Sequence, residues 1–403
     1  SINYRLVNRL ISESNNKIEI FSPSNEKFKN RLSDSELARW IIAFQGFTGT
    51  GDKAKFPGMK ESASKGWLLG LGGVYLSGKT IKETLLLNMS LERPSLSESP
   101  IWEKELSEKI EGLKKQLPEN LSELYTNWSR LLKIDADEKD KSISELKAVQ
   151  LPGINSQEFF LEQMTLWKYS TGGNDKDHFI PRTHNVNQSF WRSFGSLNLR
   201  EINGEKNIKP GIIDWHNTLV DKGFISGKSV SINSVGMSYN RDASTMPNNE
   251  ISDSLNIYNE ILADIADNGW INVISNEVNN VKSAIDFTFK GFLKDIELIR
   301  NLREGTLSEN LLEEAYYNID LPFRDWISDL KIEDEKESKI EIWRKTLITI
   351  LKKMAKDILD GASNRDYIGT SVKRDKKSNV DEYLNIIIAY NRFIWSLNKS
   401  QTK

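Results

Sequence analysis

The stretch from Lys65 to Asn88, KGWLLGLGGVYLSGKTIKETLLLN, decides how the fold of this chain is interpreted. Residues 73–80 match G-x-x-x-x-G-K-[ST], a pattern in which backbone N–H groups hold phosphates, the lysine reaches the terminal phosphates and the hydroxyl binds magnesium. The pattern requires a buried strand before it and a helix directly after it. A helix is expected, because Ile81, Leu85 and Met89 share one helical face.

The strand that a nucleotide site needs is not indicated by the sequence. Two glycines interrupt residues 68–72, and glycine weakens a strand interior. The run 211–215 (GIIDW) is a short apolar segment between a proline and a turn, and it supplies no convincing partner carboxylate. We therefore expect Val74 to Leu76 to turn at Ser77-Gly78 into a core helix or strand. A P-loop nucleotide-binding enzyme using Gly73 to Thr80 remains the alternative.

Composition limits the class of protein. With 403 residues, 38% of them hydrophobic, the chain is long enough for two or so domains. No window has the apolar length of a membrane span, and residues 1–10 lack the features of a signal peptide, so we expect a cytoplasmic protein. The absence of cysteine excludes disulfides and cysteine-ligated zinc. The net charge of −2 lacks the basic footprint of most nucleic-acid binders, so nucleic-acid contact requires local patches.

The pattern of the first two thirds predicts mixed short elements. Ser33 and Glu36 form a capping box before a helix that ends near Gly46. Residues 163–169 and 178–181 predict a hairpin, because G-G-N-D lies between them. Other expected elements are a strand over 229–238 and helices over 100–132, interrupted at Pro118, and 143–149.

From about residue 268 the pattern changes to long amphipathic helices with short polar breaks. They are expected over 270–303, 306–330, 336–361 and 379–397. Four helices with short connections favour an antiparallel bundle. The predicted fold class is therefore α+β, with a mixed domain over 1–267 followed by a four-helix bundle over 268–403.

Six blocks, in order, resemble the CasA family, the large subunit of the type I-E CRISPR surveillance complex Cascade. The blocks are 40–49 (WIIAFQGFTG), 66–88 (GWLLGLGGVYLSGKTIKETLLLN), 124–130 (LYTNWSR), 151–169 (LPGINSQEFFLEQMTLWKY), 182–197 (RTHNVNQSFWRSFGSL) and 235–244 (VGMSYNRDAS). Several blocks in family order are more specific than one eight-residue pattern. In that family the counterpart of 78–88 is a glycine turn and an ETLLLN-like run that binds no nucleotide.

The resemblance implies a non-catalytic subunit without a cofactor. Such a subunit recognises the protospacer-adjacent motif, a short tag in target double-stranded DNA, helps to open the duplex and recruits a helicase-nuclease. Its partners would be that enzyme, the other Cascade subunits, the CRISPR guide RNA and the target DNA, with no membrane contact. Guide pairing would then read sequence while this chain reads the tag and duplex shape. Family members begin with a further N-terminal segment, so we expect this chain to be a fragment.

The first predicted DNA contact is the glycine- and lysine-rich stretch 48–65. A glycine loop near this place enters the minor groove in CasA proteins, and the resemblance places it at residues 55–60 (KFPGMK). Gly58 would let the backbone approach DNA, flanked by Met59, while Lys55 and Lys60 contact phosphates. The same composition is typical of a solvated loop without a ligand.

Two further contacts are predicted in the mixed domain. Lys176, at the tip of the predicted hairpin, is the candidate for a family lysine that reaches the minor groove. The resemblance places a wedge that inserts beside the tag at Asp242, flanked by Arg241 and Ala243, with Asn240 or Arg241 reading the groove. An aspartate departs from the usual glutamine, because a carboxylate only accepts hydrogen bonds and phosphates repel it. A simple turn between strands is the alternative.

The predicted bundle offers a basic face and a basic loop. Lys345, Lys352 and Lys356 share a helical face, and Lys373 and Arg374 lie in the run 372–377 (VKRDKK). Contact with DNA phosphates would make binding sensitive to salt. Solvated charge, or a helical adaptor without nucleic-acid contact, is the alternative. His178, His184 and His216 are interpreted as ordinary structural or surface histidines, with no metal site expected.

Overall fold

The computed structural model describes most of the chain, in two compact units. The described residues are 3–4, 32–47, 66–90, 99–105, 107, 118, 120–136, 143–152, 154, 162–173, 176–197, 201–202, 205–239, 247–372 and 382–401. The first unit comprises 1–190, 196–218 and 232–254, and the second comprises 191–195, 219–231 and 255–403. The mixture of helices and sheets confirms the α+β prediction. The predicted domain boundary after residue 267 stays a prediction.

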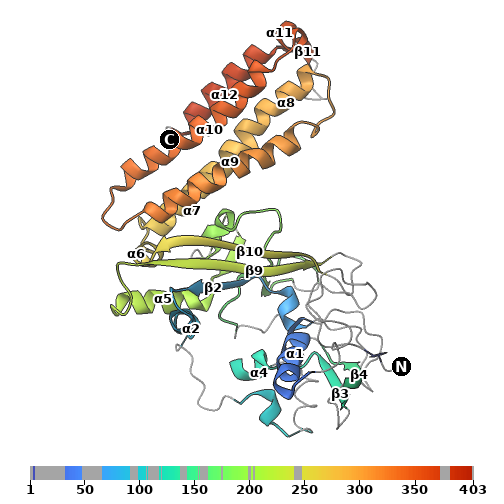
Figure 1. Cartoon of the computed structure of the whole chain (residues 1–403). Coiled ribbons are helices and arrows are strands. Elements are labelled where there is room, and N and C mark those ends of the chain that lie inside the picture. Colours follow the sequence, from blue (N-terminus) through green and yellow to red (C-terminus); the bar gives the residue numbers. More distant parts are fainter. Residues whose placement is uncertain are drawn as a thin grey trace. The chain divides into compact units, whose positions relative to one another are not determined.

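The centre of the first unit is a sheet with strand order β10-β9-β2, formed by β2 (Gly73–Ser77), β9 (Ser229–Tyr239) and β10 (Pro247–Tyr258) (Figure 1). Val74 and Leu76 of β2 are both completely buried. Alternation of buried and half-buried side chains along β2 is what a strand with one face in the core shows. The first five residues of the G-x-x-x-x-G-K-T pattern therefore form the edge strand of this sheet.

The backbone N–H and C=O groups on the free edge of β2 form hydrogen bonds with other residues of the chain. The Asn88 side chain accepts the Leu76 N–H at 2.9 Å and donates to the Leu76 carbonyl at 2.6 Å. The Val74 N–H donates to the carbonyl of Met164 at 2.7 Å. Because an unpaired strand edge exposes backbone groups that can pair with other chains, these contacts protect the edge.

The helix after β2 differs from the expected core helix. α2 (Ile81–Asn88) begins at Thr80, whose hydroxyl accepts the N–H of Glu83. The predicted apolar face is exposed, with Ile81 81% and Leu85 66% accessible, and Leu87 is the buried leucine. The helix was predicted correctly, but its placement in the core was wrong, because Asn88 anchors it at the sheet edge.

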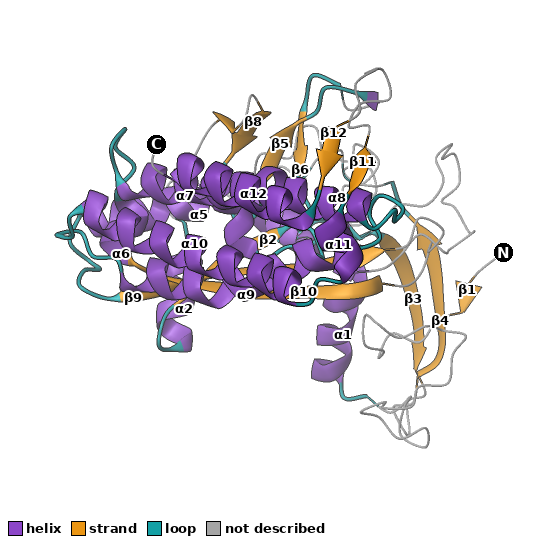
Figure 2. Cartoon of the chain, turned by 90° about the horizontal axis from the view of Figure 1, so that it is seen from above, coloured by secondary structure: helices purple, strands orange, loops and turns teal. Residues whose placement is uncertain are grey.

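A second sheet shows that the helix predicted over 143–149 is wrong. β3 (Arg130–Ala136) and β4 (Ile143–Gln150) pair antiparallel, and β1 (Asn3–Tyr4) adds to β4 (Figure 2). Of the helix predicted over 100–132, the described residues contain η3 (Ile101–Glu103), a helical residue at 107, α4 (Leu121–Tyr125) and the start of β3. Pairing with β3 overrides the local charge pattern that suggested helix.

The predicted hairpin is confirmed. β5 (Trp167–Tyr169) pairs antiparallel with β6 (Phe179–Pro181), and the four-stranded sheet is completed by β8 (Glu205–Ile208) and β7 (Glu201–Ile202). The run 211–215, predicted as a short apolar segment before a turn, instead begins helix α5 (Gly211–Asp221). Its residues Ile212 and Ile213 are completely buried.

The second unit contains the long helices. α7 (Trp270–Ser283), a π-helical segment (Ala284–Phe289) and α8 (Lys290–Ile299) follow without a break, and α9 (Ser308–Asp329), α10 (Lys336–Asp360) and α12 (Ile386–Gln401) lie alongside (Figure 1). The last helix begins later than predicted, because β12 (Glu382–Leu384) pairs with β11 (Thr370–Val372). Shorter helices are α6 (Asn259–Ala263) and α11 (Asn364–Ile368).

Aromatic rings fill the core of the second unit. Phe323 lies 4.8 Å from Trp343 and 5.5 Å from Trp326, measured between ring centroids. Trp191, from the 3-10 segment η6 (Phe190–Leu197), lies 4.4 Å from Phe323, and its Nε1 donates to Asp320 at 2.8 Å. The indole of Trp191 is thus both packed and hydrogen-bonded within the helical unit.

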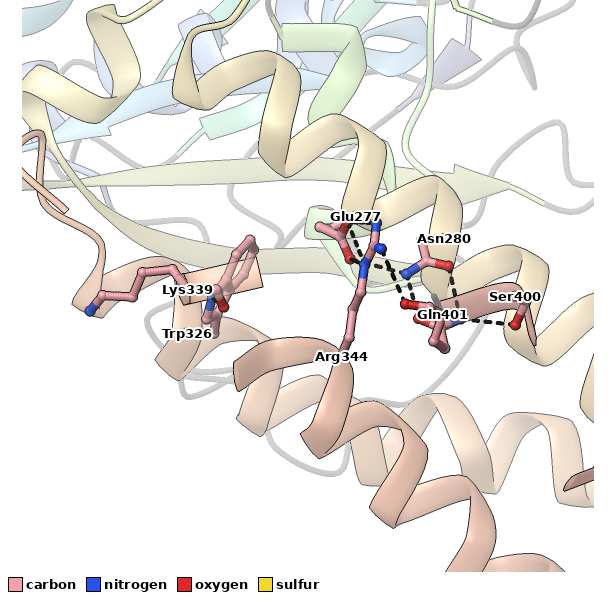
Figure 3. A network of polar contacts seen from close by, with 7 residues as sticks. All are labelled: Glu277, Asn280, Trp326, Lys339, Arg344, Ser400 and Gln401. Carbon is pink, nitrogen blue, oxygen red and sulfur yellow. Dashed lines mark hydrogen bonds and ion pairs between the residues drawn. The ribbon is translucent and has the colours of Figure 1, made fainter. Parts of the chain in front are cut away.

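A polar network around the ion pair of Arg344 and Glu277 links three helices of this unit (Figure 3). Arg344 of α10 donates Nη2–H to Glu277 of α7 at 2.7 Å and Nε–H to the same carboxylate at 3.2 Å. Glu277 is 1% exposed. Gln401 of α12 exchanges hydrogen bonds with Asn280 and accepts from Arg344 through its carbonyl. The carboxylate is therefore buried in a polar network to which three helices contribute.

Replacing Arg344 with Ala should destabilise the protein by about 3 kcal/mol, because removing one member of a buried pair leaves an uncompensated charge. Urea unfolding followed by circular dichroism measures the change. Lys345→Ala is the matched control on the same helix, since its contact with Glu341 is exposed, and it should leave the unfolding free energy unchanged. Equal effects of the two variants would contradict the importance of the buried pair.

Candidate nucleic-acid interface and a neighbouring cavity

The G-x-x-x-x-G-K-T pattern does not form a phosphate loop. Its first five residues are strand β2, where a phosphate-binding site needs an open loop. The N–H groups after the strand are already used by side chains of α2 and its cap. Glu83 accepts from Lys79 at 2.7 Å, Thr84 accepts from Gly78 at 3.1 Å and Thr80 accepts from Glu83 at 3.1 Å. A phosphate would have to displace these contacts, and the geometry therefore disfavours the nucleotide-binding alternative.

The predicted glycine loop lies outside the described residues, whereas the residues on either side of it, 32–47 and 66–90, are described. Lys55, Gly58, Met59 and Lys60 belong to this undescribed stretch. A Cβ added to Gly66 would lie 2.3 Å from the carbonyl oxygen of Gly46, so the two backbones touch. Only glycine permits such an approach at residue 66. The residues that flank the segment 48–65 are therefore adjacent in space.

Gln45 fixes the end of α1 (Asp34–Phe47) beside this place. Its side-chain oxygen accepts the N–H groups of Ser129 and Arg130, both at 2.9 Å, and its Nε2 donates to the Arg130 carbonyl at 2.8 Å. At the other end of α1, the Ser33 hydroxyl accepts the N–H of Glu36, as the predicted capping box requires. The helix boundary near Gly46 is confirmed.

The predicted wedge also lies outside the described residues. Asn240, Arg241, Asp242 and Ala243 fall in the segment between β9 and β10. These two strands are neighbours in the sheet, and the connection between them is too short for a parallel crossover, so they run antiparallel. The strand predicted over 229–238 is confirmed.

Lys176 is exposed where the β5–β6 hairpin turns. Its N–H donates to the carbonyl of Gly173, which has a φ of 72°, and Asp177 closes the turn by donating to the Ser170 carbonyl at 2.8 Å. The ammonium group of Lys176 is thus presented by a hydrogen-bonded turn. That placement is compatible with a phosphate or groove contact.

Two of the lysines predicted on α10 already have partners. Lys345 contacts Glu341 at 2.6 Å, and Lys356 contacts Asp360 at 2.6 Å. The Asp360 carboxylate raises the pKa of Lys356 through a hydrogen bond and its charge. Exposed pairs of this kind are weak, so phosphates can compete for these lysines. Lys352 lies half-buried on the same face, and Lys373 and Arg374 fall outside the described residues.

A cavity that the sequence did not indicate lies against the β10-β9-β2 sheet. Its volume is about 440 Å³, in the range of ligand pockets. Its walls combine Trp67, stacked on Tyr125 with ring centroids 5.7 Å apart, with apolar residues of the sheet and two glutamates. Tyr125 is 40% exposed, so the cavity reaches solvent. The lining includes Phe47, Trp67, Tyr125, Glu162, Met237 and Glu250.

Glu162 is the unusual group of this cavity. It is 5% exposed, its Oε1 accepts the Met164 N–H at 2.7 Å and the Tyr125 hydroxyl at 3.4 Å, and its Oε2 is buried without a hydrogen-bond partner among the described residues. Burial raises the pKa of Glu162 to about 7, against the opposing effect of these hydrogen bonds. A buried carboxyl with a raised pKa inside a pocket marks a candidate functional site.

His184 and His216 make side-chain contacts within the first unit. Nε2 of His184 contacts the Gly73 carbonyl at 2.9 Å, and burial lowers the pKa of His184. His216 is completely buried in α5, while His178 is exposed next to the hairpin turn. No group of His, Asp and Glu among the described residues could hold a metal ion. None of the described helices has the length and apolar character needed to cross a membrane.

Comparison with known families decides the class of protein. The family model of CRISPR-associated protein Cse1 matches residues 6–353, which is most of the chain. The chain belongs to the Cse1 family. A solved Thermus thermophilus structure carries both names, CasA and Cse1, so the resemblance to CasA is confirmed. Comparison with curated proteins gives no match.

Solved structures share the fold of this Cse1-family chain. Thermobifida fusca Cse1 matches with 22% identity and a TM-score of 0.77, over 93% of this chain and 72% of that one. A CasA structure from Thermus thermophilus matches with 15% identity and a TM-score of 0.62, over 93% and 74%. A chain of a CRISPR RNA-guided surveillance complex matches with 13% identity and a TM-score of 0.60, over 91% and 68%.

Replacing Glu162 with Gln should stabilise the protein above pH 7. The pKa of Glu162 rises from 4.5 to about 7 on folding, so the stability contributed by its protonated form is complete below pH 4.5 and is lost as pH rises to 7. Glutamine does not titrate. The variant should therefore match the parent below pH 4.5 and exceed it by up to about 3 kcal/mol above pH 7, measured by urea unfolding across pH.

Glu250→Gln is the matched control, because Glu250 lines the same cavity but is exposed. Tyr125 and Glu250 are the titratable side chains that line the cavity with Glu162. A difference between Glu162→Gln and the parent that does not change with pH would contradict the raised pKa.

Replacing Lys79 with Ala should have no effect on ATP binding, because we expect none in the parent. Calorimetric titration of the parent with ATP and magnesium should give no binding heat, since β2 occupies the place of the phosphate loop. Parent binding that disappears in Lys79→Ala would restore the nucleotide-binding alternative.

Proposed function

We propose that this chain is the non-catalytic large subunit of a type I-E Cascade complex. Membership of the Cse1 family, shown by the match over residues 6–353, is the observation that carries the proposal. The likeness of its fold to a chain of a CRISPR RNA-guided surveillance complex supports the same role. Its partners are the other Cascade subunits and the CRISPR guide RNA, and it acts in the cytoplasm.

Within that complex the chain recognises the protospacer-adjacent motif in target double-stranded DNA, helps to open the duplex and recruits the helicase-nuclease. Touching backbones at Gly46 and Gly66 support a tag-reading loop over 48–65, because they hold both of its ends. Neighbouring strands β9 and β10 hold both ends of the wedge segment around Asp242. Lys176 on its hydrogen-bonded turn is placed for a third contact.

The helical unit would act as the four-helix bundle of domain 268–403. Its four helical segments are α7 to α8, α9, α10 and α12. Lys345 and Lys356 of α10 would bind DNA phosphates in place of the carboxylates that they contact in the free chain. Lys373 and Arg374 follow in the sequence and would add to this basic surface. Each neutralised phosphate would steepen the salt dependence of binding.

Replacing Gly58 with Asp in the assembled complex should abolish discrimination between tagged and untagged duplexes. A carboxylate in the proposed loop blocks close approach and repels phosphates. Target-duplex binding across salt concentrations measures the effect, and the parent should prefer the tagged duplex at least roughly tenfold. Gly291→Asp, an identical change at an open position of α8, is the control and should keep the preference.

If the parent complex binds tagged and untagged duplexes equally, tag recognition by this chain is wrong. If Gly58→Asp keeps the preference, recognition belongs to another segment, and the assignment of residues 55–60 fails.

A further inference from the structure

The cavity beside the sheet has the features of a binding site that the proposed contacts do not use. It combines a partly exposed pair of aromatic rings, apolar walls and one buried carboxyl oxygen that lacks a hydrogen-bond partner among the described residues. An unsatisfied buried acceptor costs free energy, and a ligand that donates a hydrogen bond would remove that cost. Glu162 therefore selects for a ligand that carries a donor.

The aromatic pair indicates the shape of that ligand. Trp67 and Tyr125 are stacked, with ring centroids 5.7 Å apart and ring planes inclined by 27°, and Tyr125 is partly exposed. A flat ring could extend this stack. Flat heterocycles stack on such rings in single-stranded nucleic-acid sites, whichever base is present, because every base has a π-face. A neutral donor suits the apolar lining better than a cation, because a full charge is costly to desolvate.

The position of the cavity points to nucleic acid. Phe47 and Trp67 of its wall lie on either side of the segment 48–65, while Met237 and Glu250 lie in the two strands that flank the segment 240–246. Both segments are proposed above to contact the tagged duplex. An unpaired base released where the duplex opens would therefore have this cavity within reach.

We propose that the cavity binds a single unpaired nucleobase with an exocyclic amino group, which stacks on the Trp67–Tyr125 pair and donates to Glu162. This inference rests on the proposed DNA-binding function and adds a base-capture site to it. Adenine, cytosine and guanine carry an exocyclic amino donor, whereas the N3–H of an unpaired thymine, its ring donor, lies between two carbonyl oxygens that a carboxylate repels. Capturing a base would offset part of the cost of unstacking it.

The substitution Glu162→Gln inverts the chemistry of the site. The Met164 N–H holds the acceptor at Oε1, so the glutamine carbonyl should occupy that position and its NH₂ the position of Oε2. The cavity then presents a donor in place of an acceptor. Preference should change from bases with an amino group to thymine, whose O4 accepts a hydrogen bond.

The test measures binding of the full-length chain to short fluorescent single strands of dA, dC, dT or abasic residues by anisotropy at pH 8. All strands carry the same phosphates, so differences in affinity report the base. The parent should bind dA and dC about tenfold tighter than dT and abasic strands, the effect of one hydrogen bond to a charged group. Glu162→Gln should prefer dT, and Glu250→Gln should behave as the parent.

Equal binding of dA and abasic strands, or an unchanged preference in Glu162→Gln, would overturn the proposal. Absence of any binding to single strands would overturn it as well. The tagged-duplex measurement on the assembled complex is independent of these results. Tag discrimination without base preference would contradict the base-capture site alone. A parent complex that does not discriminate tagged from untagged duplexes would contradict the proposed function.

Discussion

The pairing of β2 at the edge of the β10-β9-β2 sheet is the constraint on which the first unit depends. Val74 and Leu76 enter the core, and Asn88 and Met164 occupy the backbone groups that the strand leaves unpaired. Because glycines lie on both sides of the strand, the chain can enter and leave it sharply. A motif that in another context would form an open phosphate loop is here committed to a sheet.

The same constraint creates the cavity. Met164 donates its N–H to Glu162 and accepts from Val74, so the strand edge and the buried carboxyl are held by one residue. Rigid support of this kind keeps a polar group in place within an apolar wall. The position of the Glu162 carboxyl therefore depends on the position of the edge strand.

Local sequence patterns predicted the elements that neighbouring residues determine, such as the helix capped by Ser33 and the hairpin around Gly173. They failed for β4, which is a strand through its pairing with β3, and for the face of α2, whose burial is set by Asn88. Resemblance identified the family. Glu162 was missed although its block was recognised, because the cavity joins segments from residue 47 to residue 252. A lone glutamate within an apolar run was the available signal.

Because the backbones of Gly46 and Gly66 are in contact, the length of the segment between them has little effect on the stability of the rest of the protein. Once two backbone points are joined, the entropy of closing the chain between them grows only logarithmically, by about 0.6 kcal/mol for each doubling. Insertions or deletions in residues 48–65 are therefore thermodynamically inexpensive. Relatives can therefore change the length of this segment, and with it the DNA contact proposed for it, while the sheet and its helices stay the same.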